Sequence, residues 1–291
     1  MTQWKADDVV DQTGRTFIVT GANSGLGAEV ARGLGEAGAR VILACRNIDK
    51  AEVAARSIGS NATARWLDLA DLASIRAFAE TVDSVDVLVN NAGVMGVPLR
   101  RTVDGFEMQI GTNHLGHFAL TGLLKERLTD RVVTMSSAAH RLGAISRDDL
   151  NWEQRRYKRW AAYGQSKLAN LLFTYELQRR LSNSGSTLRA LASHPGYADT
   201  NLQRHTETFQ DHFMAFGNRV AAQSAQMGSL PALYAATAPD ALGGSFIGPD
   251  GLFEMRGHPT VVTSNKRSHD LRTAEELWAL SEQLTGVSYQ F

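Results

Sequence analysis

Residues 20–27 read TGANSGLG, a glycine-rich stretch with the spacing G-x-x-x-G-x-G. An apolar, β-branched run precedes it, and apolar residues at helical spacing follow it. A strand, a glycine turn and a helix in this order place the N-terminus of the helix beside the turn. Unpaired N–H groups and the positive end of the helix dipole then favour an anion there. The stretch predicts a phosphate cradle, with a purely structural turn as the alternative.

Short apolar runs alternate with helical patterns through the first two thirds of the chain. This alternation predicts an α/β protein with a doubly wound parallel sheet of about seven strands and helices on both faces, a three-layer Rossmann fold. The strands are continuously apolar, as is typical of strands buried on both faces. The expected strands are 16–20, 40–45, 63–67, 85–89, 131–135, 187–193 and 244–248, and the expected helices are 25–37, 48–58, 71–82, 103–128 and 161–184.

The chain has 291 residues and no stretch that resembles a linker, so we expect one domain with a core at about 14–250. An amphipathic pattern predicts a helical tail at about 268–286. Its apolar face would carry Leu277, Leu280 and Leu284.

Two long segments, 140–160 and 198–226, do not fit the alternation of strands and helices. Loops of this length in a compact domain are usually functional or disordered. We expect 198–226 to be a lid that closes over a substrate and excludes water. Its Phe213, Met214 and Phe216 would either line a substrate pocket or pin the lid to the core, and the sequence favours neither.

Composition argues against several classes of partner. Lys+Arg and Asp+Glu number 30 each, and this balance indicates neither a nucleic-acid partner nor an anionic membrane surface. Cys45 is the only cysteine, which leaves no intrachain disulfide and no thiolate metal cluster. The acidic N-terminus does not resemble a signal peptide, and no apolar segment is long enough for a membrane span. We therefore expect a soluble, cytoplasmic protein.

A second informative stretch is YGQSK, residues 163–167. Tyr163 and Lys167 are four residues apart, so on a helix they share one face. Upstream, VVTMSS ends an expected strand at Ser136 and Ser137. A phenol, an ammonium and a hydroxyl could therefore meet at one edge of the sheet. Taken alone the pattern is weak, because Y-x-x-x-K pairs occur by chance on many exposed helices.

The combination of motifs is more specific. TGANSGLG, NNAG at 90–93, Asn113, Ser137, YGQSK and PG at 195–196 occur in this order. Over about residues 14–250 the chain resembles the short-chain dehydrogenase/reductase superfamily. The spacer between SSAAH and YGQSK, and the following SKLANLLFTYELQRRL, resemble its retinol dehydrogenase-like and WW-domain-oxidoreductase-like branch. In that family the G-x-x-x-G-x-G turn binds the phosphates of a nucleotide.

The resemblance implies a catalytic tetrad of Asn113, Ser137, Tyr163 and Lys167. Ser137 rather than Ser136 is chosen from the family pattern. A free phenol has a pKa of about 10, and a nearby ammonium lowers it. Tyr163 could then exchange a proton with an alkoxide or alcohol while Ser137 orients the carbonyl oxygen. By resemblance, Lys167 also holds the nicotinamide ribose and Asn113 anchors a water relay.

The end of the second expected strand favours NADP(H) over NAD(H). NAD-specific sheets usually place an acidic residue there to bind the ribose 2′-hydroxyl. Here the strand ends in Cys45, and Arg46 follows. A guanidinium can bind a 2′-phosphate that a carboxylate would repel. A solvated surface arginine is the alternative.

The remaining cofactor contacts come from the resemblance. Asp68 and Leu69 match the pair beside the adenine, and the segment after 195 matches the one that holds the carboxamide. The full expected set is Gly21, Asn23, Ser24, Gly25, Leu26, Gly27, Arg46, Asp68, Leu69, Asn90, Ala92, Gly93, Tyr163, Lys167, Pro195, Gly196 and Thr200.

No metal site is expected from the histidines. His114 and His117 lack the carboxylate of a zinc pattern, so we interpret them as helix residues next to Asn113. His205 and His212 lie in the long loop without metal-like spacing to third ligands.

The expected function is an NADP(H)-dependent oxidoreductase that acts on a carbonyl or alcohol of an apolar small molecule. An epimerase or dehydratase would share Y-x-x-x-K but usually shows T-G-x-x-G-x-x-G and a larger C-terminal domain. A non-catalytic NADP(H)-sensing Rossmann protein would not need the Tyr/Lys pair. Members of the family often pair through the two long helices, so a homo-oligomer is possible.

Overall fold

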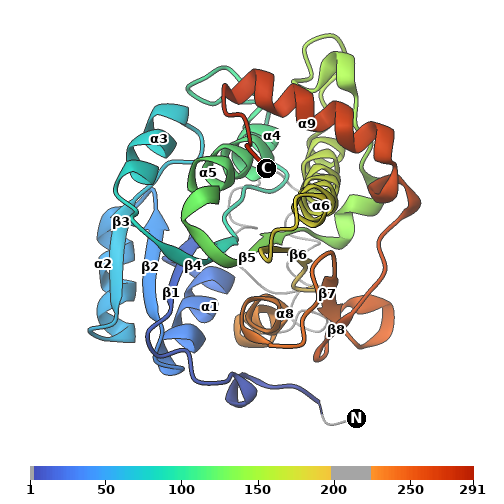
Figure 1. Cartoon of the computed structure of the whole chain (residues 1–291). Helices are drawn as coiled ribbons and strands as arrows, with labels where there is room; N and C mark the ends of the chain where they lie inside the picture. Colours follow the sequence, from blue (N-terminus) through green and yellow to red (C-terminus); the bar gives the residue numbers. More distant parts are fainter. Residues whose placement is uncertain (1–2, 198–223) are drawn as a thin grey trace.

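The computed structural model describes residues 3–197 and 224–291 and is built around one eight-stranded sheet (Figure 1). The strand order is β3-β2-β1-β4-β5-β6-β7-β8. The first seven strands pair in parallel, and β8 pairs with β7 in the antiparallel direction. The strands are β1 (Thr16–Thr20), β2 (Arg40–Cys45), β3 (Ala62–Trp66), β4 (Val85–Asn90), β5 (Leu128–Met135), β6 (Arg189–Ser193), β7 (Phe246–Pro249) and β8 (Pro259–Val261).

The seven strands predicted from the sequence are confirmed, with ends that differ by up to three residues. The eighth, β8, was not predicted. It is three residues long, begins at a proline and is largely exposed, so it carries no apolar run. The expectation of a single domain stays a prediction.

Helices cover both faces of the sheet (Figure 1). Because side chains alternate along a strand, Phe17 and Val19 contact one layer while Ile18 contacts the other. The first layer contains α1 (Gly25–Glu36), α2 (Ile48–Ile58) and α8 (Ala225–Thr237). The second contains α3 (Leu72–Glu80), α5 (Gly116–Leu124) and α6 (Arg159–Asn183).

Helix α8 was not predicted, and its first residues overlap the end of the expected lid, 198–226. Pro231 lies inside this helix, and a proline in the sequence normally argues against a continuous helix at that position. Most of its side chains are buried, so it lacks the polar stripe that marks an amphipathic helix.

The single helix expected at 103–128 is divided into four pieces. They are α4 (Met108–Ile110), a π-helical turn (Gly111–Leu115), α5 and a 3-10 turn (Lys125–Arg127). Asn113 lies in the π-helical turn. Such turns interrupt the regular ladder of backbone hydrogen bonds and often mark functional positions.

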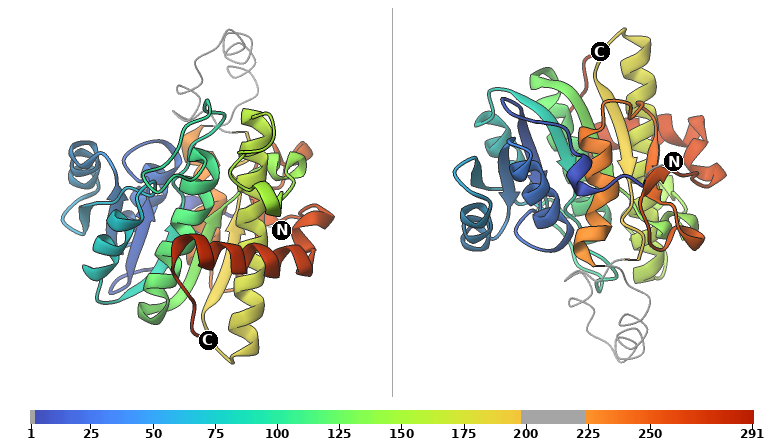
Figure 2. Two further views of the ribbon diagram at one scale, coloured as in Figure 1. Left: turned by 90° about the horizontal axis from the view of Figure 1, so that it is seen from above. Right: turned by 90° about the horizontal axis from the view of Figure 1, so that it is seen from below.

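The expected C-terminal helix is present as α9 (Leu271–Thr285), which packs on α6 from outside (Figure 2). Leu277 is buried, and Leu280 and Leu284 pack against the same apolar cluster, as expected. Trp278 stacks on Phe173 of α6 with ring centroids 5.8 Å apart. Among the described residues, no helix is both long and apolar enough to cross a lipid bilayer.

Two buried histidines predict a fold that is sensitive to acid. Burial lowers the pKa of His114 to about 3 and that of His117 to about 4, from an ordinary value of 6.5. Below pH 6.5 the unfolded chain therefore binds more protons than the folded chain. As the pH falls, the free energy of unfolding should decrease by up to about 1.4 kcal/mol per pH unit for each histidine.

The variant His114→Gln tests this expectation. Glutamine keeps an N–H group for the Ser281 hydroxyl, which lies 2.9 Å from His114 Nε2, but it does not titrate. We expect urea unfolding between about pH 4 and pH 7 to show that the free energy of unfolding of the variant decreases less steeply with falling pH than that of the wild type. The difference should be the contribution of one histidine. A decline as steep as that of the wild type would contradict the assignment.

Candidate active site

The glycine turn packs directly on the NNAG segment that follows β4. Gly21 follows β1 and has a φ of +65°, which L side chains rarely adopt. A Cβ atom on Gly21 would lie 2.9 Å from Ala92 Cβ, and one on Gly27 would lie 2.5 Å from Asn91 Nδ2. Both positions therefore exclude larger residues, and the first turn of α1 stays beside the carboxyl end of β4.

A hydrogen-bonded chain connects this turn to Asn113. The Thr20 hydroxyl accepts the N–H groups of Asn91 (2.9 Å) and Ala92 (3.0 Å) and lies 2.9 Å from His117 Nε2. His117 Nδ1 donates to the Asn113 carbonyl at 3.0 Å. The sequence motifs indicate no role for Thr20 and identify His117 only as a neighbour of Asn113. Polar residues at the ends of β1 and β4 were the available signal.

The Asn113 side chain is fully used by the protein. Its Oδ1 accepts the N–H of Val94 at 2.8 Å, and its Nδ2 donates to the Val94 carbonyl and to Ser166 Oγ, both at 2.9 Å. Only the backbone carbonyl of Asn113 could therefore take part in a water relay. Gly93 lies beside it: a Cβ there would be 3.0 Å from Asn113 Oδ1 and 3.7 Å from Lys167 Nζ.

The two serines after β5 have different surroundings. Ser136 is buried, and its hydroxyl donates to the Lys167 carbonyl at 2.9 Å. Ser137 is partly exposed and forms a hydrogen bond with Tyr163. Its hydroxyl also accepts the N–H of Ala139 at 3.2 Å. This geometry favours Ser137 as the serine that faces a substrate.

Tyr163 and Lys167 share one face of α6, as the sequence predicts. The ammonium nitrogen of Lys167 lies 5.7 Å from the centre of the Tyr163 ring. It donates to the Met135 carbonyl at 3.1 Å, and Asn170 Nδ2 donates to the same carbonyl at 2.9 Å. Both Tyr163 and Lys167 are buried. The carboxyl end of β5 therefore fixes the position of the lysine.

Burial dominates the proton affinities of this pair. It raises the pKa of Tyr163 to about 12, with the Ser137 hydrogen bond acting in the opposite direction. It also lowers the pKa of Lys167 to about 8. The sequence predicts a Tyr163 pKa below the ordinary value, and the shift has the opposite direction, because burial disfavours the phenolate. At neutral pH Tyr163 is thus a phenol that can donate a proton.

Cys45, the last residue of β2, and Arg46, which follows it, lie in different environments. Cys45 is buried under the glycine turn, and burial raises the pKa of its thiol to about 11. Arg46 is exposed, and none of the described residues forms an ion pair with it. Next to β3, the Asp68 carboxylate accepts the N–H of Ala70 at 2.9 Å, and Leu69 is buried.

Asn90 and the segment Pro195–Gly196 differ in which of their atoms could contact a cofactor. Asn90 is fully buried, and its Nδ2 donates to Thr121 Oγ1 at 3.0 Å, so any contact falls to its backbone. Pro195 and Gly196 follow β6 at the same sheet edge as Ser137. Of the other expected contacts, Asn23 and Ser24 precede α1, and Gly25 and Leu26 are its first residues. Several residues named from the sequence lie outside the described residues: Thr200, His205, His212, Phe213, Met214, Phe216 and all of the expected lid up to residue 223.

Within residues 3–197 and 224–291, no group of three His, Cys, Asp or Glu side chains is placed to hold a metal ion. His114 and His117 contact different partners, Ser281 for the first and Thr20 with Asn113 for the second.

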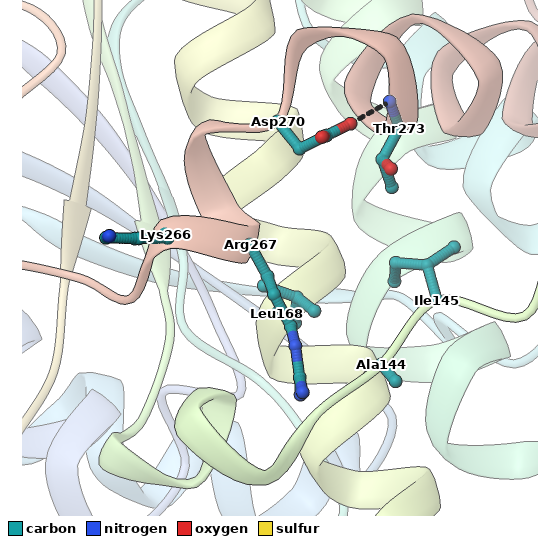
Figure 3. A pocket seen from close by; sticks show the side chains of 7 residues that line it. All are labelled: Ala144, Ile145, Leu168, Lys266, Arg267, Asp270 and Thr273. Atoms are coloured by element: carbon teal, nitrogen blue, oxygen red, sulfur yellow. Dashed lines mark hydrogen bonds between the residues drawn. The ribbon is translucent and has the colours of Figure 1, made fainter.

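A pocket of about 400 Å³ lies elsewhere, between the segment after Gly143, α6 and the start of α9 (Figure 3). Asp270 caps α9 there by accepting the N–H of Thr273 at 2.7 Å. None of the four catalytic candidates lines this pocket. It is lined by Ala144, Ile145, Leu168, Lys266, Arg267, Asp270 and Thr273.

Comparison with known proteins identifies a family. A family model described as short chain dehydrogenase matches residues 15–211. Human retinol dehydrogenase 13 is 44% identical over 291 residues, covering 94% of this chain and 85% of that protein. Human retinol dehydrogenase 12 is 41% identical, covering 97% of this chain and 89% of that protein.

Solved structures show the same fold. A crystal structure of an uncharacterised protein from Mycobacterium Paratuberculosis is 52% identical, with a TM-score of 0.88 and full coverage of both chains. The Pseudomonas aeruginosa RhlG/NADP active-site complex is 27% identical, with a TM-score of 0.65, over 83% of this chain and 97% of that one.

The buried lysine predicts a variant that is more stable than the wild type. The ordinary pKa of lysine is 10.5 and that of Lys167 is about 8, so between these values the unfolded chain binds more protons. The free energy of unfolding therefore rises with pH in this window, and below it the buried cation lowers stability. Lys167→Met should be more stable at pH 7 by about 1–3 kcal/mol.

Denaturant unfolding at several pH values measures this difference. The advantage of Lys167→Met should shrink as the pH rises from about 8 towards 10. If the variant is instead less stable at pH 7, the hydrogen bond to Met135 outweighs desolvation and the interpretation is wrong.

Proposed function

Because the chain belongs to the short-chain dehydrogenase family, we propose that it is an NADP(H)-dependent oxidoreductase. It transfers a hydride between the nicotinamide and a carbonyl or alcohol group of an apolar small molecule, with Tyr163 as proton donor or acceptor. The observation that carries the proposal is the placement of Tyr163, Ser137 and Lys167 together at the carboxyl edge of the sheet, with Gly93 beside the lysine.

The residues at this edge fit a dinucleotide. The turn from Gly21 to Gly27 opens at the N-terminus of α1, where N–H groups and the helix dipole attract phosphate. Gly93 has no side chain that would fill the space beside Lys167 and Asn113. When bound, the nicotinamide would supply or accept the hydride.

The side chains of the chain itself would handle the proton. Ser137 would donate a hydrogen bond to the substrate oxygen and orient it. Tyr163, a phenol at neutral pH, would give its proton to that oxygen as an alkoxide develops. The Lys167 cation would stabilise the phenolate that remains. By family resemblance, water held at the Asn113 carbonyl would return the proton. This order of events favours reduction of a carbonyl.

The local charge at the end of β2 supports NADP(H). Arg46 is exposed immediately after the strand, while Cys45 is buried and contributes no carboxylate. A guanidinium there can bind a 2′-phosphate in bidentate fashion. The RhlG complex, which contains NADP, is one structural relative that agrees with this choice.

The substrate class rests on the relatives and on the residues near Gly93. Human retinol dehydrogenases 12 and 13 are named for an apolar alcohol. In this chain Val94 and Met95 are partly exposed directly after Gly93. We therefore propose an apolar alcohol or aldehyde. The cytoplasmic location and the possible homo-oligomer stay predictions.

Tyr163→Phe tests the catalytic role. Removal of the hydroxyl should lower kcat/KM for a panel of apolar aldehydes by at least about a thousandfold, because the substrate oxygen then loses its proposed proton donor. NADPH binding should be retained. Tyr175→Phe is the matched control on the same helix, since its hydroxyl faces Ser264 instead. NADPH binding without turnover by the wild type on any panel member would favour the nucleotide-sensing alternative.

Arg46→Ala tests the choice of cofactor. Loss of the guanidinium should raise the Kd of NADPH by at least about tenfold and leave the Kd of NADH within about twofold. Fluorescence titration of the two nucleotides gives both values. Arg56→Ala is the control, because Arg56 is also exposed but pairs with Glu52 on α2. Equal losses for both nucleotides would refute contact with the 2′-phosphate.

A further inference from the structure

The loop between β7 and β8, residues 250–258, has a strained backbone. Phe253 and Glu254 have φ angles of 53° and 57°, and Trp152 is the other described non-glycine residue with positive φ. A left-handed conformation of this kind costs on the order of 1–3 kcal/mol per residue and persists only where surrounding contacts enforce it. The contacts of Glu254 are therefore informative.

The Glu254 carboxylate contacts two segments of the candidate active site. Its Oε1 accepts Arg141 Nη2 at 2.9 Å, and its Oε2 lies 3.1 Å from His194 Nε2. His194 is fully buried, and its Nδ1 accepts the N–H of Gly196 at 3.2 Å. The ring proton of His194 is thus on Nε2, 3.1 Å from Glu254 Oε2, a close contact that lacks the alignment of a hydrogen bond. His194 and Arg141 together hold the pKa of the Glu254 carboxyl below its usual range.

The two segments are those that carry Ser137 and Gly196. Arg141 belongs to the 3-10 turn Ala138–Leu142, whose N-terminal cap is Ser137. Gly196 follows β6, and the next N–H, that of Tyr197, donates to the Met255 carbonyl at 2.7 Å. The loop therefore contacts the Gly196 segment through its backbone as well as through Glu254.

A buried layer lies beneath these contacts. His140 is fully buried, and its Nδ1 donates to the Ser137 carbonyl at 2.7 Å. The rings of His140 and His194 both pack against Phe246, with centroids 5.7 Å and 5.0 Å away. An exposed ion pair is worth at most about 1 kcal/mol, which would not offset the backbone strain. The burial of His194 and the Met255 contact make this more than a surface pair.

We propose that Glu254 is a positioning residue that fixes the Pro195–Tyr197 segment relative to Ser137, so that the nicotinamide half of a bound dinucleotide lies in register with the Ser137 hydroxyl. The inference rests on the proposed function. It predicts that Glu254 affects binding of the nicotinamide half, which the glycine turn and Arg46 do not contact in the proposed arrangement.

Glu254→Gln is the most conservative test. The carboxylate offers one oxygen to His194 and one to Arg141, and both partners are N–H donors. Glutamine has one oxygen and one NH₂ group, so it can satisfy only one of them at unchanged size. Glu276→Gln is the matched control, because Glu276 also contacts two side chains that carry N–H groups, Arg147 and Arg272, away from the site.

Comparison of two nucleotides distinguishes an effect on the nicotinamide half of the site from an effect on the adenosine half. We expect Glu254→Gln to raise the Kd of NADPH by about tenfold and to leave the Kd of 2′,5′-ADP, which lacks the nicotinamide, within about twofold. Equal effects on both nucleotides, or no effect, would overturn the inference while the proposed function stands. Failure of the wild type to bind either nucleotide would overturn the proposed function and this inference with it.

Hydrogen exchange gives a readout that needs no nucleotide. In Glu254→Gln the amides of Gly196 and Tyr197 should exchange at least about tenfold faster, because their acceptors are no longer held. The helix 271–285 should be unaffected, and Glu276→Gln should not change the Gly196 amide. Unchanged exchange at Gly196 and Tyr197 would overturn the inference.

Arg141→Met is the second variant, in case Glu254→Gln does not fold. It removes only the contact towards the Ser137 turn and leaves the contact between Glu254 and His194 in place, and the Arg141 side chain is exposed. We expect kcat to fall by about three- to tenfold with NADPH affinity unchanged. An unaltered kcat would overturn the role of Glu254 in placing Ser137.

Discussion

The hydrogen bond from the Lys167 ammonium to the Met135 carbonyl is the contact on which the candidate active site depends. It ties the middle of α6 to the carboxyl end of β5, and Ser136 and Asn170 strengthen the same junction. The lysine is buried, so keeping its side chain charged costs free energy. Tyr163, one turn earlier on α6, takes its position from this junction. A stable fold alone would be better served by an apolar residue.

Around this junction the site has two supports. On one side, Thr20 and His117 connect the glycine turn to the Asn113 carbonyl, so the proposed phosphate cradle and relay are one hydrogen-bonded unit. On the other side, Glu254 and His194 connect a strained loop to the segment after β6. Both supports consist largely of buried polar groups, which are costly unless each is paired. The fold is therefore less stable than one with apolar residues at these positions, and in return the polar groups of the candidate active site are held in fixed positions.

The sequence predicted the seven parallel strands because their apolar runs are continuous, and it placed Tyr163 and Lys167 on one face from helical spacing alone. It missed α8, where Pro231 and near-complete burial remove the usual helix signals. It gave the wrong direction for the Tyr163 pKa, because the depth of burial depends on packing between distant segments. The role of Glu254 was likewise invisible, since its partners lie far away in the sequence.

The most direct test of the central claim is the pH profile of kcat for reduction of an apolar aldehyde with NADPH, measured from about pH 6.5 to about pH 10 in the wild type and in Lys167→Met. The pKa of Lys167 is about 8, so the lysine is a cation in the lower part of this range and neutral in the upper part, while Tyr163 stays a phenol throughout. If the Lys167 cation stabilises the phenolate that remains after proton transfer, kcat of the wild type should fall at least about tenfold as the pH rises through about 8, and Lys167→Met should be slow at every pH. A wild-type kcat that stays constant through pH 8, or a Lys167→Met kcat equal to that of the wild type at about pH 7, would contradict the account.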